Sequence, residues 1–347
     1  KGFKYDYGTG GIHGCIKSGV YESDNDYIII DADVGSLYPN LAIQNGFFIE
    51  HLGKEFTEVY KSIIDLRMEA KKAKNMTLSD GFKLAANSVY GKSNDINSFL
   101  YDPKFTMQIT LNGQLLLTML AETLVNTFGT KIQVLQINTD GITVKIPREF
   151  VSAYYALCRL WEYQTKLNLE YVEYSKMVIR DVNNYLAVDV GGKVKYKGAF
   201  EVDKVVGSEP AYHKDNSFRI IPLAISEYFT KGISIETTIK NHTNIYDFCG
   251  RIKFTRDSYG QIHYLKDDVQ VSQKQQKNVR YYISNKGATF YKYYNKGTNE
   301  VINKGYQVTI FNDFVDKKWE DYNINYNFYI KEAMKIVNEI EDKQLSL

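Results

Sequence analysis

Two carboxylates, Asp33 and Asp140, have the local sequence needed to hold a hard cation. Asp33 lies just beyond a β-branched run, 27–31, which is expected to be a buried strand. Asp140 lies in the turn Asn138-Thr139-Asp140-Gly141, between two runs expected to pair as a hairpin. Carboxylates on adjacent strands can hold two Mg²⁺ ions and clamp an in-line phosphoryl transfer. Each carboxylate taken alone would also suit an ordinary turn.

A second group consists of Lys83, Asn87 and Tyr90, which recur at i, i+4 and i+7. On a helix over 80–90 they share one face. A polar and aromatic stripe of this kind suits a triphosphate bound by the lysine and a base or sugar packed on the ring. Arg67, on the preceding expected helix, would add a phosphate contact. The alternative for this stripe is a solvated helix face.

These side chains need a scaffold, and the hydrophobic periodicity indicates a mixed α+β one. Expected helices cover 56–74, 80–90, 106–127, 147–167 and 223–231. Expected strands cover 27–31, 131–137 and 142–146, and short strands with glycine turns dominate from 171 onward.

Two details of the expected helices are specific enough to test. The spacing of Val59, Ile63, Leu66 and Ala70 predicts that they form the apolar face of the first helix. Ser79 or Asp80 is expected to cap the second helix.

The composition excludes several classes of protein. A chain of 347 residues with 44% hydrophobic and 24% charged residues is typical of a globular protein. Its three cysteines lie far apart, which indicates free thiols in a reducing compartment such as the cytoplasm. The histidines lack zinc-site spacing. No apolar stretch is long enough to span a bilayer, and no secretory leader is expected.

Charge points to a polyanion only locally, since 43 basic and 41 acidic residues leave a net charge of +2. Residues 251–306 hold eleven lysines and arginines against four acidic residues, together with eight tyrosines. Basic groups interleaved with aromatic rings suit a phosphate backbone and stacked bases. The alternative is a solvated, tyrosine-rich β surface.

Three segments resemble, in order, the polymerase motifs of family B DNA polymerases. Residues 33–39 (DVGSLYP) match D-x-x-S-L-Y-P, and residues 83–91 (KLAANSVYG) match K-x-x-x-N-S-x-Y-G. The turn at 138–141 (NTDG) matches D-T-D-S more loosely. Residues 63–72 look like the first fingers helix, and residues 7–11 resemble the linker Y-x-G-G. The resemblance extends over nearly the whole chain.

The resemblance implies a template-directed DNA polymerase that uses two Mg²⁺ ions, dNTPs and primer–template DNA. Asp33 and Asp140 would ligate both ions with help from the Val34 carbonyl, and Lys83 would bind the triphosphate and protonate the leaving pyrophosphate. Nucleotide contacts are also implied for Ser36, Leu37, Tyr38, Arg67, Asn87 and Tyr90. Tyr38 would exclude a ribose 2′-OH. DNA contacts are implied for Gly10, Gly11, Gly91, Thr139, Tyr185, Lys195, Lys197 and Arg280.

The same resemblance implies a right-hand architecture with an antiparallel-sheet palm. Residues 1–54 would form the linker and first part of the palm, 55–91 short two-helix fingers, 92–203 the rest of the palm, and 204–347 a mixed α/β thumb. The thumb's basic stretch would hold the duplex. No proofreading domain is expected in this chain.

Compact fingers and a composition rich in Lys, Asn, Ile and Tyr favour a phage or mobile-element replication enzyme. Such an enzyme would work in the host cytoplasm, with replication accessory proteins as possible partners.

Four positions depart from the family pattern. Asn138 and Gly141 replace an aspartate and a serine, and the asparagines at 183–184 replace lysines that grip the primer end. One alternative is therefore a DNA-binding relative without catalysis. Another is a metal-dependent nucleotide-sugar transferase that uses Asp31-x-Asp33. The transferase predicts no salt-sensitive affinity for primer–template DNA.

Overall fold

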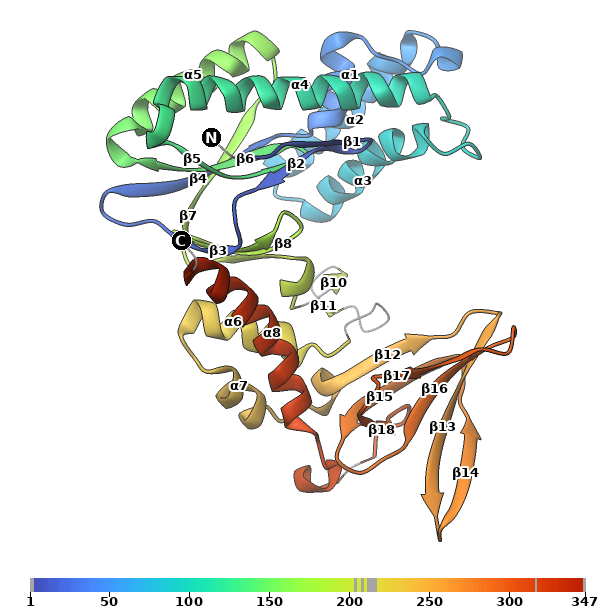
Figure 1. Cartoon of the computed structure of the whole chain (residues 1–347). Helices are drawn as coiled ribbons and strands as arrows, with labels where there is room; N and C mark the ends of the chain where they lie inside the picture. The colour runs from blue at the N-terminus through green and yellow to red at the C-terminus, as the bar shows by residue number, and fades with distance from the viewer. Residues whose placement is uncertain (1–2, 203–204, 207–208, 211–216, 316, 346–347) are drawn as a thin grey trace. The chain divides into compact units, whose positions relative to one another are not determined.

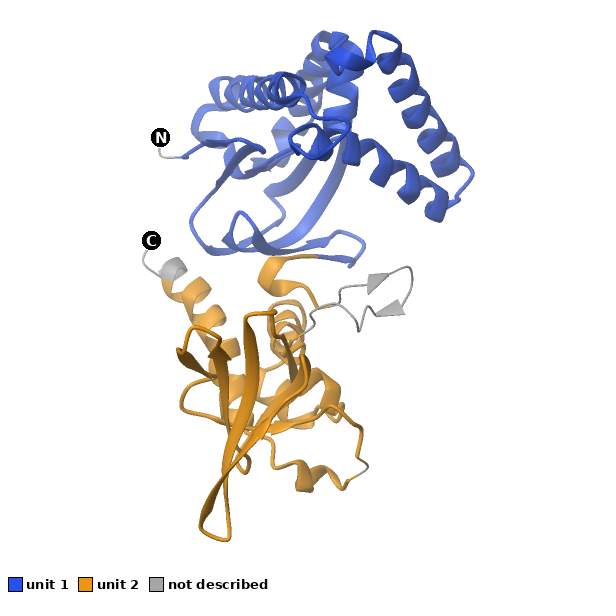
Figure 2. Ribbon diagram, turned by 90° about the vertical axis from the view of Figure 1, so that its right-hand side faces the viewer, with its two compact units in different colours: residues 1–195 blue, residues 196–347 orange. Residues whose placement is uncertain are grey.

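The structure is a computed structural model that describes residues 3–202, 205–206, 209–210, 217–315 and 317–345. The chain divides into two compact units, Lys1–Lys195 and Tyr196–Leu347, shown in different colours in Figure 2. Helices and antiparallel sheets make up both units, so the fold is mixed α+β, as the sequence predicts. The palm, fingers and thumb ranges stay predictions.

The first unit is built on one antiparallel sheet with the strand order β1-β2-β5-β6-β4-β7-β8-β9, and β3 pairs with β7. The strands are β1 (Asp6–Gly8), β2 (Gly11–Cys15), β3 (Gly19–Glu22), β4 (Tyr27–Val34), β5 (Gln133–Asn138), β6 (Gly141–Pro147), β7 (Leu169–Asp181), β8 (Asn184–Asp189) and β9 (Val194–Lys197). The central strand β4 pairs with β6 on one side and β7 on the other.

The two faces of β4 have different neighbours. Ile28, Ile30, Ala32 and Val34 belong to the core cluster that includes the helices, whereas Ile29 belongs to a second cluster with Tyr174 and Tyr185. Because side chains alternate along a strand, Asp31 and Asp33 share the face of Ile29. The carboxylates are thereby placed on the side of the sheet opposite the main helical core.

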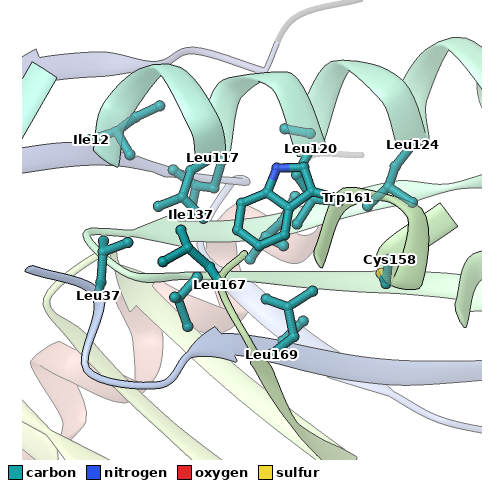
Figure 3. Close-up of a cluster of buried hydrophobic side chains, with 14 of the residues drawn as sticks. Ile12, Leu37, Leu117, Leu120, Leu124, Ile137, Cys158, Trp161, Leu167 and Leu169 are labelled. Atoms are coloured by element: carbon teal, nitrogen blue, oxygen red, sulfur yellow. The ribbon is translucent and has the colours of Figure 1, made fainter. Parts of the chain in front are cut away.

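That core is formed by α4 (Pro103–Phe128) and α5 (Val151–Thr165), which lie along the sheet in Figure 1. Asp102 accepts a hydrogen bond from the Phe105 amide and caps α4, with Pro103 at the first helical position. Figure 3 shows how Leu117, Leu120 and Leu124 of α4 gather with Trp161 and Cys158 of α5 above the strands. This packing gives β4 and the β5–β6 hairpin a rigid backing.

The remaining helices of the first unit are α1 (Leu37–Asn45), η1 (Glu50–Leu52), α2 (Glu55–Lys72) and α3 (Met76–Ser93). Helices α2 and α3 pack together, and the buried Tyr60 hydroxyl donates to the Ala86 carbonyl at 2.8 Å. Short helices η2 (Gly129–Lys131) and η3 (Arg148–Phe150) flank the β5–β6 hairpin.

The predicted apolar face of α2 is right for Ala70 and the half-buried Ile63 but wrong for Val59 and Leu66, and the predicted cap of α3 is wrong. The buried side chains of α2 are Tyr60, Ile64 and Ala70, while Val59 is 61% exposed and Leu66 is also exposed. Two of the buried positions, Tyr60 and Ile64, lie one residue after Val59 and Ile63, and the Tyr60 hydroxyl bonds α3 from this face. Helix α3 starts at Met76 because Asn75 accepts a hydrogen bond from the Leu78 amide and so caps it.

The second unit combines helices with two sheets. Its helices are η4 (Gly198–Phe200), α6 (Ile220–Lys231), α7 (Ile235–Asn241), η5 (Ile245–Phe248), η6 (Trp319–Tyr322) and α8 (Tyr326–Leu345). One sheet has the order β12 (Cys249–Lys253), β15 (Asn278–Ser284), β18 (Gln307–Ile310). The other has the order β14 (Val269–Lys274), β13 (Ser258–Lys266), β16 (Thr289–Tyr294), β17 (Asn299–Ile302). Strands β10 (Val205–Val206) and β11 (Glu209–Pro210) form a small ribbon.

Many aromatic residues of the second unit are structural. Phe248, Tyr282, Phe290 and Tyr329 are fully buried, and the Tyr329 hydroxyl donates to the Phe248 carbonyl at 2.8 Å. Part of the tyrosine content of 251–306 is therefore core. Along the described residues, no helix is both long and apolar enough to cross a membrane.

Candidate active site

A cavity of about 400 Å³ opens where β4 ends and the β5–β6 hairpin turns. Backbone pairing brings the segments of Asp33 and Asp140 together. Asp33 pairs with Gly141 across the sheet, and the Val34 amide donates to the Asp140 carbonyl at 2.7 Å. The cavity is lined by Asp33, Val34, Gly35, Ser36, Leu37, Tyr38, Arg67, Lys83, Asn87, Tyr90, Thr139, Asp140 and Glu170. All the residues predicted to act as catalytic, metal or nucleotide ligands thus line one cavity, and their roles stay predictions.

Glycine is the only residue type that fits at position 141 while the Asp33 side chain keeps its present position. A Cβ built on Gly141 would stand 1.8 Å from Asp33 Oδ1 and 3.2 Å from the Ala32 carbonyl oxygen. Any side chain there would push the carboxylate away. Gly141, where the family pattern has serine, therefore allows Asp33 to lie where it does.

Asp33 lies in an environment that disfavours its charge. Burial, and then the neighbouring Asp31 carboxylate, raise the pKa of Asp33 to about 6, with Asp140 acting in the same direction and Lys195 opposing. The carboxylates of Asp31 and Asp33 therefore repel each other, and the Lys195 ammonium group offsets part of that repulsion.

Asp31 itself does not line the cavity. It is 6% exposed; its Oδ1 accepts from the Thr143 hydroxyl at 2.6 Å and its Oδ2 from the Tyr174 hydroxyl at 3.0 Å. Lys195 Nζ lies 3.5 Å from Asp31 Oδ2 and 3.7 Å from Asp33 Oδ2. Burial lowers the pKa of Lys195, but Asp31, Tyr185 and Asp33 outweigh it and raise the pKa well above its usual range.

The opposite wall of the cavity is cationic and rich in hydrogen-bond donors. Arg67 reaches from α2 to the hydroxyl of Ser36, the left-handed residue that precedes α1. Lys83 and Asn87 lie on the exposed face of α3 that borders the cavity. The amides at the start of α1 have no partners within the helix, which favours an anion at this point.

Two tyrosines form the floor between these walls. The rings of Tyr38 and Tyr90 lie 4.1 Å apart between centroids at 34°. The Tyr38 hydroxyl donates to the Gly10 carbonyl, and the Tyr90 hydroxyl shares a hydrogen bond of 2.7 Å with Thr110. Burial and then Tyr90 raise the pKa of Tyr38, so its phenol stays neutral. Tyr38 is therefore locked in place by β1–β2 and α3 together.

Glu170 lines the cavity although no sequence motif marks it. It lies at the start of β7, directly opposite Asp33 in the β4–β7 register, and Lys71 Nζ pairs with its Oε1 at 2.9 Å. Only the strand pairing brings it to the site. A carboxylate at the head of an otherwise unremarkable strand offers no signal in the sequence.

Asn138 has a structural task that an aspartate cannot perform. Its Nδ2 donates to the Val182 carbonyl at 3.2 Å, and Gln136 Nε2 donates to the same oxygen at 3.0 Å. Two side-chain amides thus tie the hairpin to the β7–β8 turn. In that turn Asn184 Nδ2 donates to both oxygens of Asp181, and the Asn183 amide donates to Asp181 Oδ1. The Asn184 side chain therefore helps to shape the turn, whereas Asn183 contributes its backbone amide.

The residues predicted to contact DNA are placed in several different settings. Gly11 is buried with φ +152°, and a Cβ there would lie 3.1 Å from Thr139 Cγ2; Thr139 also shares a hydrogen bond with His13 at 3.1 Å. Tyr185 is in the core at 5% exposure. Gly10 and Gly91 are exposed. Lys197 and Arg280 belong to the second unit, where Arg280 lies 5.5 Å from the Tyr246 ring centre.

The oxygens at the cavity are of the kind that Mg²⁺ prefers. Within the described part of the chain, no group of three or more His, Cys, Asp and Glu side chains is arranged for a metal. Mg²⁺ is commonly held by one or two carboxylates together with substrate phosphates and water. Asp33, Asp140 and the Val34 carbonyl fit that pattern.

Comparison with known proteins shows a likeness in fold. No family model and no curated protein matches the sequence. A solved structure, the family B DNA polymerase from the hyperthermophilic archaeon Pyrobaculum calidifontis, is similar to it with a TM-score of 0.52 and 14% identity. The match covers 98% of this chain and 47% of that chain, so this chain spans about half the length of the archaeal polymerase. The chain has a family B DNA polymerase-like fold.

Proposed function

We propose that the chain is the core of a template-directed DNA polymerase that adds dNTPs to a primer 3′-OH. The observation that carries the proposal is one cavity in which two aspartates, two cationic side chains and a locked tyrosine meet. The cavity has one wall for metal, one for phosphate and a floor for the sugar. The fold-level likeness to a family B polymerase supports the same conclusion.

Each wall would have its own part in the reaction. Asp33 and Asp140 would hold two Mg²⁺ ions, which when bound neutralise charge on the attacking and leaving oxygens. Arg67, Lys83 and the amides of Ser36 and Leu37 would orient the triphosphate, with Asn87 beside it. Lys83 would also donate a proton to the departing pyrophosphate.

The remaining finer assignments are part of the same proposal. Residues 55–91 would be the fingers, residues 1–54 and 92–203 the linker and palm, and residues 204–347 the thumb that holds duplex DNA. The setting would be phage or mobile-element replication in the host cytoplasm. Its support is the short segment 55–91 and the Lys-, Asn-, Ile- and Tyr-rich composition.

Primer extension with and without Asp140 tests the proposal. With Mg²⁺, four dNTPs and a labelled primer–template, the wild-type chain should extend the primer as the template directs. Asp140→Ala should lose extension because one carboxylate cannot hold the ions that both would share. Asp65→Ala, which removes an exposed carboxylate paired with Lys61, should keep full activity.

One experimental result would favour a competing function, and the structure already disfavours another. Salt-sensitive DNA binding without extension by the wild type would favour the non-catalytic relative. A transferase that uses Asp31-x-Asp33 is disfavoured by geometry, because Asp31 is buried outside the cavity and bonded to Thr143 and Tyr174.

A further inference from the structure

A buried carboxylate beside the cavity has no part in the function proposed above. Asp31 shares a strand face with Asp33, yet it does not line the cavity, and its two oxygens accept hydrogen bonds from the Thr143 and Tyr174 hydroxyls. Two hydroxyl groups satisfy its hydrogen bonds. Hydroxyl groups do not neutralise a charge, however, and a buried carboxylate needs a cation nearby.

That cation is Lys195 of β9. Its Nζ lies at nearly equal distances from Asp31 and Asp33, at 3.5 and 3.7 Å. Both distances are those of ion pairs and exceed a tight hydrogen bond, so the ammonium group is shared between the carboxylates. Tyr185 and Tyr174 also lie close enough to interact electrostatically with the Lys195 ammonium group.

Asp33 is held on its other side by the backbone of Gly141, which approaches too closely for any Cβ. The carboxylate therefore lies in a narrow slot between Gly141 and Lys195. A cation that enters the cavity must compete with the ammonium group for Asp33.

We propose that Asp31 anchors Lys195 beside Asp33 as a built-in counter-ion that lowers the affinity of the Asp33–Asp140 pair for a divalent cation. This role replaces the DNA contact that the sequence predicts for Lys195. The inference rests on the proposed function only in taking Asp33 and Asp140 as the cation ligands. Lys195 is a positioning residue, because it acts through Asp33.

Mn²⁺ binding to the full chain, measured by electron paramagnetic resonance without DNA or nucleotide, tests the proposal. Lys195→Met should bind Mn²⁺ about tenfold or more tightly, because a positive charge next to a ligand is removed. Asp31→Asn should bind it about tenfold more weakly, because Lys195 is then left to Asp33 alone. Lys195→Arg keeps the charge and should stay near wild type.

The double variant Asp31→Asn/Lys195→Met still allows the proposal to be tested if Lys195→Met folds poorly. It removes both charges of the pair, leaves no buried charge unpaired, and should return the Mn²⁺ affinity to within about threefold of wild type. An unchanged Mn²⁺ affinity in both variants that lack Lys195 and in Asp31→Asn would overturn the proposal. So would a wild type that binds no Mn²⁺.

A DNA-binding role for Lys195 predicts a different result. Lys195→Met would then keep its Mn²⁺ affinity and lower the salt dependence of primer–template binding by about one ion. The primer-extension assay tests the proposed function separately. A wild type that binds Mn²⁺ through Asp140 but never extends a primer refutes the polymerase alone. A wild type that extends, while the variants keep wild-type Mn²⁺ affinity, refutes the counter-ion alone.

Discussion

At the scale of single residues, the cavity depends on close contacts that leave little freedom. Asp33 lies against the Gly141 backbone, and Tyr38 is tied to the Gly10 carbonyl while its ring packs on Tyr90. Catalysis that works by positioning is sensitive to shifts of about 1 Å. Small substitutions at these points should therefore have large effects on turnover.

Gly141→Ala should reduce kcat by about a hundredfold while the protein stays folded, because the added Cβ displaces the Asp33 carboxylate. The measurement is single-turnover extension together with circular dichroism. Gly81→Ala is the matched control: it lies inside α3 with nothing within 4 Å of the new Cβ. Equal rates for the two variants would contradict the proposed place of Asp33 in the reaction.

Tyr38→Ala should admit ribonucleotides, because the ring that would face the sugar is gone. The readout is the ratio of kcat/KM for a dNTP and the matching NTP, which should fall by at least tenfold. Tyr163→Ala, on the exposed face of α5, should leave this ratio unchanged. Sugar discrimination that survives Tyr38→Ala would remove Tyr38 from this role.

The sequence was sufficient to predict which side chains gather at the cavity, but not all of their partners. Asp33, Asp140 and the Lys83–Tyr90 stripe were predictable because each lies in a motif whose residue spacing can be recognised in the sequence. Glu170 was not, because it reaches the cavity only through the pairing of β4 with β7. The link from Lys195 to Asp31 spans most of the first unit and likewise follows from strand order.

At the scale of elements, strand alternation and helix caps explain what was predicted well and what was not. The β5–β6 hairpin formed where its Asp-Gly turn indicated, and β4 extends past the apolar run through Asp33. The start of α3 was misplaced because Ser79 and Asp80 precede an apolar run as a cap would, whereas Asn75 is the residue that bonds the Leu78 amide. Candidate capping residues about one helical turn apart cannot be ranked from the sequence, because the deciding hydrogen bond is seen only in the structure.

Asn138→Asp should destabilise the fold by about 1–3 kcal/mol, because a carboxylate in place of the amide would face the Val182 carbonyl and leave it one donor short. Urea unfolding followed by fluorescence measures the change. Asn299→Asp, at an exposed position of β17, should stay within about 0.5 kcal/mol of wild type. Wild-type stability in Asn138→Asp would mean that the tie to the β7–β8 turn contributes little.

At the scale of the whole molecule, the near-balance of charge conceals an uneven distribution. Residues 251–306 carry the basic excess, and they belong entirely to the second unit. Part of their aromatic content is buried, so the charge is the better guide to a partner. A polyanion such as DNA is the expected partner of that unit.

Affinity for primer–template DNA should fall linearly with the logarithm of salt concentration, since bound phosphates release counter-ions. Arg280→Gln should reduce that slope by about one, as fluorescence anisotropy over a salt series would show. Lys231→Gln, whose ammonium group already pairs with Glu227, should leave it unchanged. Salt-independent binding would contradict a role in holding a phosphate backbone.

The two unusual residues of the hairpin tip have a practical consequence for protein engineering. Asn138 and Gly141 each fit a neighbour that the commoner residues would not fit: the Val182 carbonyl and the Asp33 carboxylate. Grafting the frequent D-T-D-S tip onto this chain should therefore impair it, although consensus design would recommend that exchange. Searches for similar chains would likewise do better to require only the central Thr-Asp and to accept an amide before it and glycine after it.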